Sequence, residues 1–426
     1  MNNIVTEDRT QPVRSGAFAW WHAAPRSAKK ALVAASFGWM LDSFDVMLYS
    51  MVLASLMADL HLSKGAAGIL GSITLLAAAA GGLFFGIIAD RFGRTRALMA
   101  SILIYAIFTA ACGLSQNFVQ LAVFRILLGL GMGGEWASGA SLVSETWPAK
   151  HRGKALGLMQ SSWAIGYALA AFVAAVVMPI GGWRAVFFVG ILPAFLTLWI
   201  QRGVEEPEVW KNTRSTAMTA FGGVAEIFRG KLLPLTIALM LMNACCLFAW
   251  WGFNLWVPAY LSLPVSQGGV GLSSTAMSAV VIVMQAGMWL GYVTFGFVSD
   301  AIGRKRTYIT YLLAAATLLL LYGTTRSPLF LLILGPFVAF FGTGYYTGFA
   351  AVTAEIYETR VRSTAQGVTY NAGRIASAIA PFTVGSLAQK HGFGAAFGVG
   401  SLSFLLAAFF WIWIPETKGR QLSADV

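Results

Sequence analysis

The sequence predicts an all-α membrane protein with twelve transmembrane helices in two six-helix bundles, and three observations lead to this prediction. Of the 426 residues, 58% are hydrophobic and only 11% are charged, whereas soluble domains carry about 25% charged residues. Long uninterrupted apolar runs such as 97–114 and 393–415 favour helices over the alternating strands of a membrane barrel. Finally, a set of residues recurs at an offset of 210 positions. A soluble globular protein is excluded.

Each expected span is an apolar run of about 18 to 25 residues, which is the length a helix needs to cross the hydrocarbon core. In chain order these runs lie at 31–57, 66–89, 97–114, 118–144, 154–178, 184–201, 232–262, 272–299, 307–324, 328–354, 363–388 and 393–414. Because their number is even, both termini are expected on the same side of the membrane.

The distribution of basic residues predicts which side that is. The two tails and the alternate loops on one face hold 23 of the 29 lysines and arginines, and cytoplasmic loops are enriched in these residues. The net charge of +12 is therefore explained by membrane topology, and we expect no nucleic-acid partner. The predicted organisation is a cytoplasmic tail (1–30), an N-terminal bundle (31–201), a cytoplasmic linker (202–231), a C-terminal bundle (232–414) and a cytoplasmic tail (415–426).

The repeat supports two parallel halves related by an axis along the membrane normal. The segment GIIADRFGRTR (86–96) recurs as GFVSDAIGRKR (296–306), and this spacing resembles the loop signature of the major facilitator superfamily. An Asp at a helix end caps backbone amides, and neighbouring arginines pair with carboxylates on adjacent helices. We therefore expect these positions to act in gating, with solvated loop charges as the alternative. The expected gating residues are Asp90, Arg91, Arg94, Glu145, Arg152, Asp300, Arg304, Glu355 and Arg362.

Three further stretches resemble the sialate:proton symporter family. They are WMLDSFDVMLY (39–49), GMGGEWASGASLVSETWP (131–148) and GGWRAVFFVGILP (181–193). This resemblance implies the major facilitator fold, a bacterial inner membrane, and sialic acid or a short monocarboxylate such as lactate or pyruvate as substrate. Aromatic-acid:proton symporters share a similar Asp-x-x-Asp in the first span, and sugar porters also end in a segment like PETKG (415–419).

Intramembrane ionisable residues without a counterpart 210 positions away are the candidates for chemistry, since charge at membrane depth is costly. Asp42 and Asp45 share one face of the first span, and two carboxylates in a poorly hydrated site resist double ionisation. We predict proton coupling there, with Asp45 slightly favoured, and consider Glu135 either a second proton site or the resting partner of Arg374. The alternative for either Asp is a permanent ion pair with an arginine, or a helix cap. Arg125 is considered either an electrostatic stabiliser of these carboxylates or a structural partner.

Arg374 is the predicted anion-binding residue, because a guanidinium stays charged and holds a carboxylate through two hydrogen bonds. The alternative is a permanent ion pair between helices. Polar and aromatic residues that share a face with Arg374 or lie on other spans are expected, as a set, to shape the substrate cavity. For any one of them, packing between helices is the favoured alternative. The residues of this set are Tyr370, Asn371, Tyr49, Gln160, Tyr167, Asn243, Asn254 and Gln285.

The predicted function is proton-coupled uptake of an organic anion by alternating access. Open alternatives are an aromatic-acid:proton symporter, a sugar or polyol porter, a drug:proton antiporter and a membrane protein that transports nothing. We expect no enzymatic activity, no metal and no cofactor, with protons as the coupling ion. The sequence contains no nucleotide motif of the GxxxxGKS or GxxxxGKT type, so ATP is not the expected energy source. The expected partners are the lipid bilayer and a small organic anion, and the expected state is a monomer.

Overall fold

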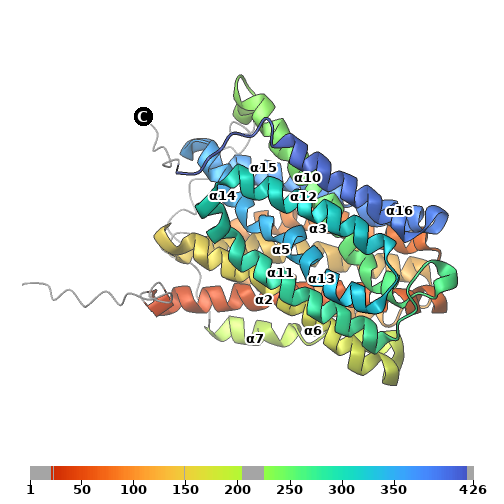
Figure 1. Cartoon of the computed structure of the whole chain (residues 1–426). Coiled ribbons are helices and arrows are strands. Elements are labelled where there is room, and N and C mark those ends of the chain that lie inside the picture. The colour runs from red at the N-terminus through yellow and green to blue at the C-terminus, as the bar shows by residue number, and fades with distance from the viewer. Residues whose placement is uncertain (1–20, 23, 148, 204–224, 420–426) are drawn as a thin grey trace, which may run out of the picture.

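The protein is a bundle of long helices in a computed structural model that describes residues 21–22, 24–147, 149–203 and 225–419 (Figure 1). Within these ranges every regular element is helical. The N-terminal half contains α2 (Arg26–Asp59), α3 (Lys64–Phe92), α4 (Arg94–Cys112), α5 (Phe118–Thr146), α6 (Ala149–Val189) and α7 (Ala194–Gly203). The C-terminal half contains α10 (Leu232–Ser262), the 3-10 turn η1 (Val265–Gln267), α11 (Ser274–Ile302), α12 (Arg304–Thr324), α13 (Pro328–Thr343), the 3-10 segment η2 (Gly344–Gly348), α14 (Phe349–Ile356), α15 (Thr359–Ser377) and α16 (Ala380–Phe410).

Ten stretches of the described chain are helical, long and apolar enough to span a bilayer. Two of these stretches, 154–197 and 365–410, have 44 and 46 residues, which at 1.5 Å per residue is about twice the thickness of the hydrocarbon core. Each contains one glycine with non-helical backbone, Gly182 (φ 68°) and Gly392 (φ 80°). The chain turns back there, so each stretch has the length for two crossings, which agrees with the predicted twelve.

Packing shows that the chain returns after each of these glycines. Beyond Gly182, Ile200 of α7 is buried with Ala31 and Leu98, which lie near the beginnings of α2 and α4. Beyond Gly392, Trp411 packs against Tyr308 near the beginning of α12, with 4.5 Å between ring centroids.

The internal repeat is visible as matching backbone geometry. Gly93 and Gly303, 210 positions apart, have φ values of 115° and 103° and separate consecutive helices in the same way. Ser63 and Ser273, also 210 apart, both cap the next helix by accepting the N–H of the residue three positions on. Gly182 and Gly392 have this offset as well, so the two halves share one architecture.

Three expected spans are less continuous than their apolar runs suggested. The run 184–201 is broken by a turn at 190–193, and the run 363–388 is broken between α15 and α16, where Pro381 stands in the first turn of the new helix. The run 328–354 is interrupted by η2, which corresponds in the repeat to an unbroken part of α5. Glycines at both ends of η2 permit this change, and a Cβ at Gly344 would collide with the Tyr311 ring.

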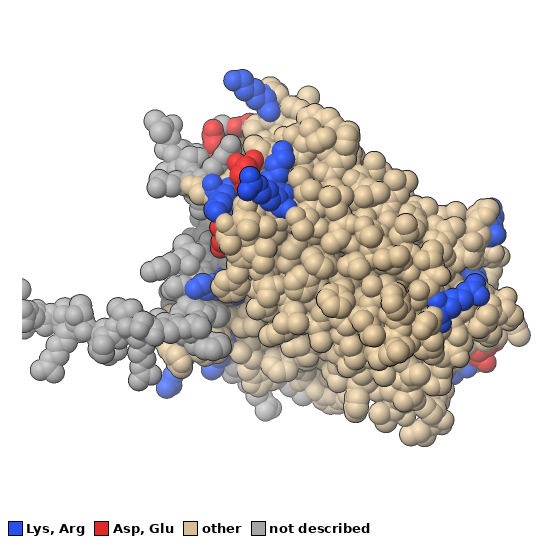
Figure 2. Space-filling model, in the orientation of Figure 1, with Lys and Arg blue, Asp and Glu red and all other residues tan. Residues whose placement is uncertain are grey.

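The described chain begins and ends on the same side of the bundle (Figure 1). We call this the terminal side and the opposite end the distal side. Charged side chains gather at these two ends, and the broad middle of the visible face carries none (Figure 2). Large apolar side chains are exposed between the ends, among them Leu76, Phe172 and Leu313. Such a belt is what a lipid-facing surface requires.

Candidate functional site

Three buried carboxylates form a cluster inside the N-terminal half. Asp42 and Asp45 of α2 are 0% and 1% exposed, and Glu135 of α5 is 0% exposed. Thr109 Oγ1 of α4 donates to Asp45 Oδ2 over 3.1 Å. Among the described residues, both oxygens of Asp42, both of Glu135 and the other oxygen of Asp45 have no hydrogen-bond partner. Three acids therefore share one apolar region with a single donor.

Close helix packing brings these acids together. Gly38 of α2 faces Glu135, and a Cβ at Gly38 would lie 2.5 Å from Glu135 Oε1. Small residues at such a contact allow two backbones to approach. Tyr105 of α4 also lies at this contact, since its hydroxyl is 3.5 Å from the carbonyl oxygen of Gly38. Sequence reasoning found the three acids, and the structure shows that they are neighbours.

Arg125 of α5 is 1% exposed and lies over the Tyr49 ring, with 4.1 Å between the guanidinium carbon and the ring centroid. Its Nε and Nη1 have no hydrogen-bond partner in the described chain. The Tyr49 hydroxyl donates to the carbonyl of Ala67 over 2.8 Å. Tyr49 was predicted to line the substrate cavity, but here its ring supports Arg125 and its hydroxyl joins two helices.

Arg374 of α15 reaches from the C-terminal half to the N-terminal half. A Cβ at Gly82 of α3 would lie 3.9 Å from Arg374 Nη1 and 3.5 Å from the carbonyl oxygen of Gly133 in α5. The Arg374 guanidinium is also close enough to Asp42 for a charge interaction. The side chain is half-buried. The predicted anion-binding residue thus meets the acidic cluster at the boundary between the halves.

Two further predicted cavity residues, Tyr370 and Asn371, lie on α15 with Arg374. Tyr370 lies one turn before Arg374 and packs edge-on against Phe349 at 6.4 Å. Asn371 donates to the Gly367 carbonyl of its own helix over 2.9 Å.

Two predicted cavity residues keep a free acceptor. Asn243 Nδ2 donates to the Thr369 carbonyl over 3.3 Å and Gln285 Nε2 to that of Val281 over 3.3 Å. Their side-chain oxygens have no partner among the described residues. Gln160 lies beside Tyr292 across the boundary between the halves.

Tyr167 and Asn254 belong to a set of contacts that joins the halves on the distal side of Asp45. The Tyr167 hydroxyl donates to the Asn254 carbonyl over 3.2 Å, and Ser50 Oγ donates to the Leu255 carbonyl over 2.7 Å. Further distal contacts are Lys64 Nζ to the Gln267 carbonyl (2.6 Å), Gly65 N–H to Gln389 Oε1 (3.2 Å) and Phe382 N–H to Ser72 Oγ (3.2 Å). The distal side is held closed by these bonds.

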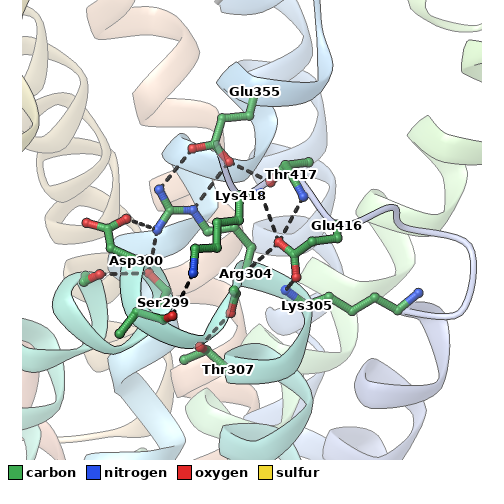
Figure 3. Close-up of polar contacts among 12 residues, drawn as sticks. Ser299, Asp300, Arg304, Lys305, Thr307, Glu355, Glu416, Thr417 and Lys418 are labelled. Atoms are coloured by element: carbon green, nitrogen blue, oxygen red, sulfur yellow. Dashed lines mark hydrogen bonds and ion pairs between the residues drawn. The ribbon is translucent and has the colours of Figure 1, made fainter. Parts of the chain in front are cut away.

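On the terminal side, Arg304 at the start of α12 binds two carboxylates (Figure 3). Its Nη2 and Nε reach Glu355 Oε1 and Oε2 over 3.0 and 3.3 Å, and Nη1 pairs with Asp300. Thr417 Oγ1 donates to Glu355 Oε2 over 2.6 Å. Arg304, Asp300 and Glu355 were predicted as gating residues, and the structure brings them into one cluster.

Glu416 is a member of this cluster that sequence reasoning did not assign. Its carboxylate accepts the backbone N–H groups of Arg304 (2.8 Å) and Lys305 (3.2 Å), and so caps α12 from the C-terminal segment. Burial acts to raise the pKa of Glu416, but the N–H donors of Lys418, Arg304, Lys305 and Thr417 outweigh it and leave that pKa below its ordinary value. The available signal was that α12 begins after Gly303, without a Ser, Thr, Asp or Asn to cap it.

The equivalent gating residues of the N-terminal half are less fully described. Arg91 lies over the neighbouring Phe92 ring at 5.5 Å. The side chains of Asp90, Arg94, Glu145 and Arg152, and that of Arg362 in the C-terminal half, lie outside the part of the structure that is described.

Comparison with known proteins places this architecture in a family. The model of the Major Facilitator Superfamily matches residues 35–268 and again 261–425. A cis,cis-muconate transport protein of Acinetobacter baylyi is 33% identical, over 96% of this chain and 97% of its own length. A sialic acid transporter of Escherichia coli is 29% identical, over 91% and 94%.

A solved structure has the same fold. The xylose transporter of Escherichia coli, in a partially occluded inward open conformation, superposes with a TM-score of 0.75, covering 93% of this chain and 100% of that one at 21% identity. The chain is therefore a multi-pass membrane transporter that belongs to the Major Facilitator Superfamily.

Proposed function

We propose that the protein is a proton-coupled symporter that takes up a small organic acid by alternating access. The observation that carries this proposal is the position of Arg374, a cation at the boundary between the halves, beside three buried carboxylates that have one hydrogen-bond donor among them. A permanent anion partner for Arg374 would leave no place for a substrate. No ion pair to Arg374 occurs among the described residues.

Protonation of the buried acids favours the state in which the site is closed to water, and closure in turn favours protonation. An ionised carboxylate sealed from water without donors is costly, whereas the neutral acid is not. A proton taken up at Asp45 or Asp42 therefore allows the cluster to close and leaves Arg374 free to hold the carboxylate of the substrate. Glu135 is close enough to Asp42 for the two charges to interact, so it takes part in the same proton equilibrium. Opening toward the terminal side hydrates the cluster and releases both ions.

The direction of uptake depends on topology. The positive-inside rule places the terminal side in the cytoplasm, and the bacterial relatives suggest the inner membrane. The distal contacts then close the outside, while Arg304, Asp300, Glu355 and their counterparts act on the cytoplasmic side. We propose that the transporting unit is a monomer, because the site lies between the two halves of a single chain.

The substrate class has two candidates. Sialic acid and short monocarboxylates such as lactate and pyruvate follow from the resemblance of the first span and from the sialic acid transporter. A planar, conjugated acid follows from the muconate transport protein and from the aromatic ring of Tyr370, which lies near Arg374 and has Tyr346 as a neighbour. Both candidates use Arg374 in the same way.

Uptake driven by a pH gradient in proteoliposomes tests the proposal, with lactate, pyruvate, sialic acid, benzoate and glucose offered in turn. We expect one of the acids to accumulate, Arg374→Ala to abolish this, and Arg374→Lys to restore only a small part because a lysine lacks the planar fork. Lys390→Ala, at an exposed basic residue, is the matched control and should transport normally. Accumulation of glucose alone, or normal uptake by Arg374→Ala, would refute the proposal.

A further inference from the structure

A row of three tryptophans crosses the boundary between the halves one turn from Asp42. Trp39 of α2 lies against Trp163 of α6 with 4.7 Å between ring centroids, tilted by 49°. Trp163 meets Trp251 of α10 edge-on at 5.9 Å, and this second contact joins the N-terminal half to the C-terminal half. The proposed function assigns no role to these rings.

The packing that orients Trp163 is close and specific. A Cβ at Gly166 would overlap the carbonyl oxygen of Met40, so α2 and α6 are in backbone contact beside the tryptophans. Ser43 Oγ donates to the carbonyl of Trp163 over 2.8 Å. Ser43 follows Asp42 directly, so the residue that anchors Trp163 is the neighbour of a proposed proton site.

Trp39 carries a buried hydrogen-bond donor without an acceptor. Its side chain is 7% exposed, and its indole Nε1 has no partner among the described residues. Trp39 and Asp42 are three residues apart, so they share one face of α2. Leaving an N–H unpaired in an apolar region is unfavourable, and buried indole N–H groups usually find a partner. No acceptor for this donor is found among the described residues, so the position is open to an acceptor from a bound molecule.

We infer that Trp39 is a specificity-determining residue, whose indole N–H donates to the transported acid while the Trp163 ring packs on the flat part of that acid. This inference rests on the proposed function. The substrate is then held by one donor from each half, Arg374 from the C-terminal half and Trp39 from the N-terminal half. An acid that accepts hydrogen bonds from both donors stabilises the closed state more than an acid that binds only one of them. The flat ring of Trp163 selects planar conjugated acids over saturated ones.

The test measures binding of benzoate and cyclohexanecarboxylate to purified protein by isothermal titration calorimetry, since these acids have the same ring size and differ in planarity. Trp39→Phe keeps an aromatic ring and removes the N–H, and we expect it to weaken benzoate binding about tenfold. Trp411→Phe is the matched control: Trp411 is 0% exposed, its Nε1 also has no partner in the described chain, and it packs on Tyr308 in the other half. It should change benzoate affinity by less than about twofold.

The second variant, Trp163→Leu, tests the stacking surface independently. Wild type should prefer benzoate to cyclohexanecarboxylate, and Trp163→Leu should remove this preference, which a general loss of stability does not do. The inference is overturned if wild type does not bind benzoate, if Trp39→Phe binds it as tightly as Trp411→Phe, or if Trp163→Leu keeps the preference. It is also overturned if Trp39→Phe keeps benzoate affinity and loses only proton coupling. That result would mean that the indole N–H of Trp39 donates to the Asp42 carboxylate and not to the substrate. The proposed function fails separately, when wild type accumulates no acid in the uptake panel.

Discussion

The cap that Glu416 places on α12 predicts a local and pH-dependent loss of stability when the carboxylate is removed. Glu416 accepts the N–H groups of Arg304 and Lys305, which are among the four amides at a helix start that have no partner in the helix. A cap of this kind contributes about 1 kcal/mol, and an anion at a helix N-terminus adds about 0.3–1 kcal/mol. Since Glu416 is exposed and Glu416→Gln keeps one acceptor oxygen, we expect a loss near the lower end, about 1 kcal/mol.

Hydrogen exchange at the first turn of α12 is the direct assay. A loss of about 1 kcal/mol in local opening corresponds to roughly fivefold faster exchange of the Arg304 and Lys305 amides. Glu358→Gln is the matched control, because Glu358 lies at the start of α15 and its side chain makes no cap hydrogen bond. It should leave exchange at the start of α15 unchanged within about twofold.

The contribution of Glu416 to the stability of α12 should depend on pH. The pKa of Glu416 in the folded protein lies below its ordinary value of 4.5, so its contribution to stability is complete above that value and is lost as the pH falls through the folded pKa. The difference between wild type and Glu416→Gln should therefore be constant near neutral pH and shrink below about pH 4.5. Equal exchange in the two proteins at neutral pH would refute the assigned role, as would a difference that persists unchanged in acid.

Three other substitutions test the packing and the two sides of the transporter. Gly166→Ala forces a Cβ into the backbone of a neighbouring helix and should lower the midpoint of thermal unfolding by several degrees or prevent folding. Gly157→Ala is the control, because nothing lies within 4 Å of a Cβ at Gly157, and its midpoint should stay unchanged. Equal midpoints for the two variants would contradict the close packing at Gly166. Arg304→Lys replaces the planar guanidinium that binds both oxygens of Glu355, and should raise the labelling of cysteines placed on the terminal side. Unchanged labelling would show that this ion pair does not keep the terminal side closed. Tyr167→Phe removes a distal bond between the halves and should increase labelling from the distal side, so a decrease would reverse the proposed geometry.

The fold was largely predictable because hydropathy and repetition are properties of the sequence. The 210-residue offset gave two halves, and the positive-φ glycines Gly93 and Gly303 lie inside the repeated motif. The offset also joins Gly182 to Gly392, but the matches around them, such as Phe187 with Phe397 and Gly190 with Gly400, are residues common in apolar spans, so the pattern did not distinguish these two glycines. The break at η2 was not predictable from hydropathy, since a 3-10 segment and an α-helix have equally apolar compositions.

The candidate site was predictable in its charges but not in its contacts. Ionisable residues inside apolar spans are rare, and those without a counterpart 210 positions away identified Asp42, Asp45, Glu135 and Arg374. Helix rotation decides which of them meet, and no single sequence encodes that rotation in a readable pattern. Trp39 was missed for a related reason: a tryptophan in an apolar span is ordinary, and only the structure shows that its N–H has no acceptor among the described residues.

Proton movement coupled to acid movement is the central claim, and one recording tests it most directly. Proteoliposomes without a pH gradient are given an outward-to-inward gradient of the acid that accumulated in the uptake panel, and the internal pH is followed with a trapped dye while valinomycin and potassium hold the voltage at zero. Wild type should acidify the interior at a rate proportional to acid entry, whereas Asp45→Asn should exchange labelled acid without acidification. Acid entry without acidification in wild type, or full acidification by Asp45→Asn, would contradict the account.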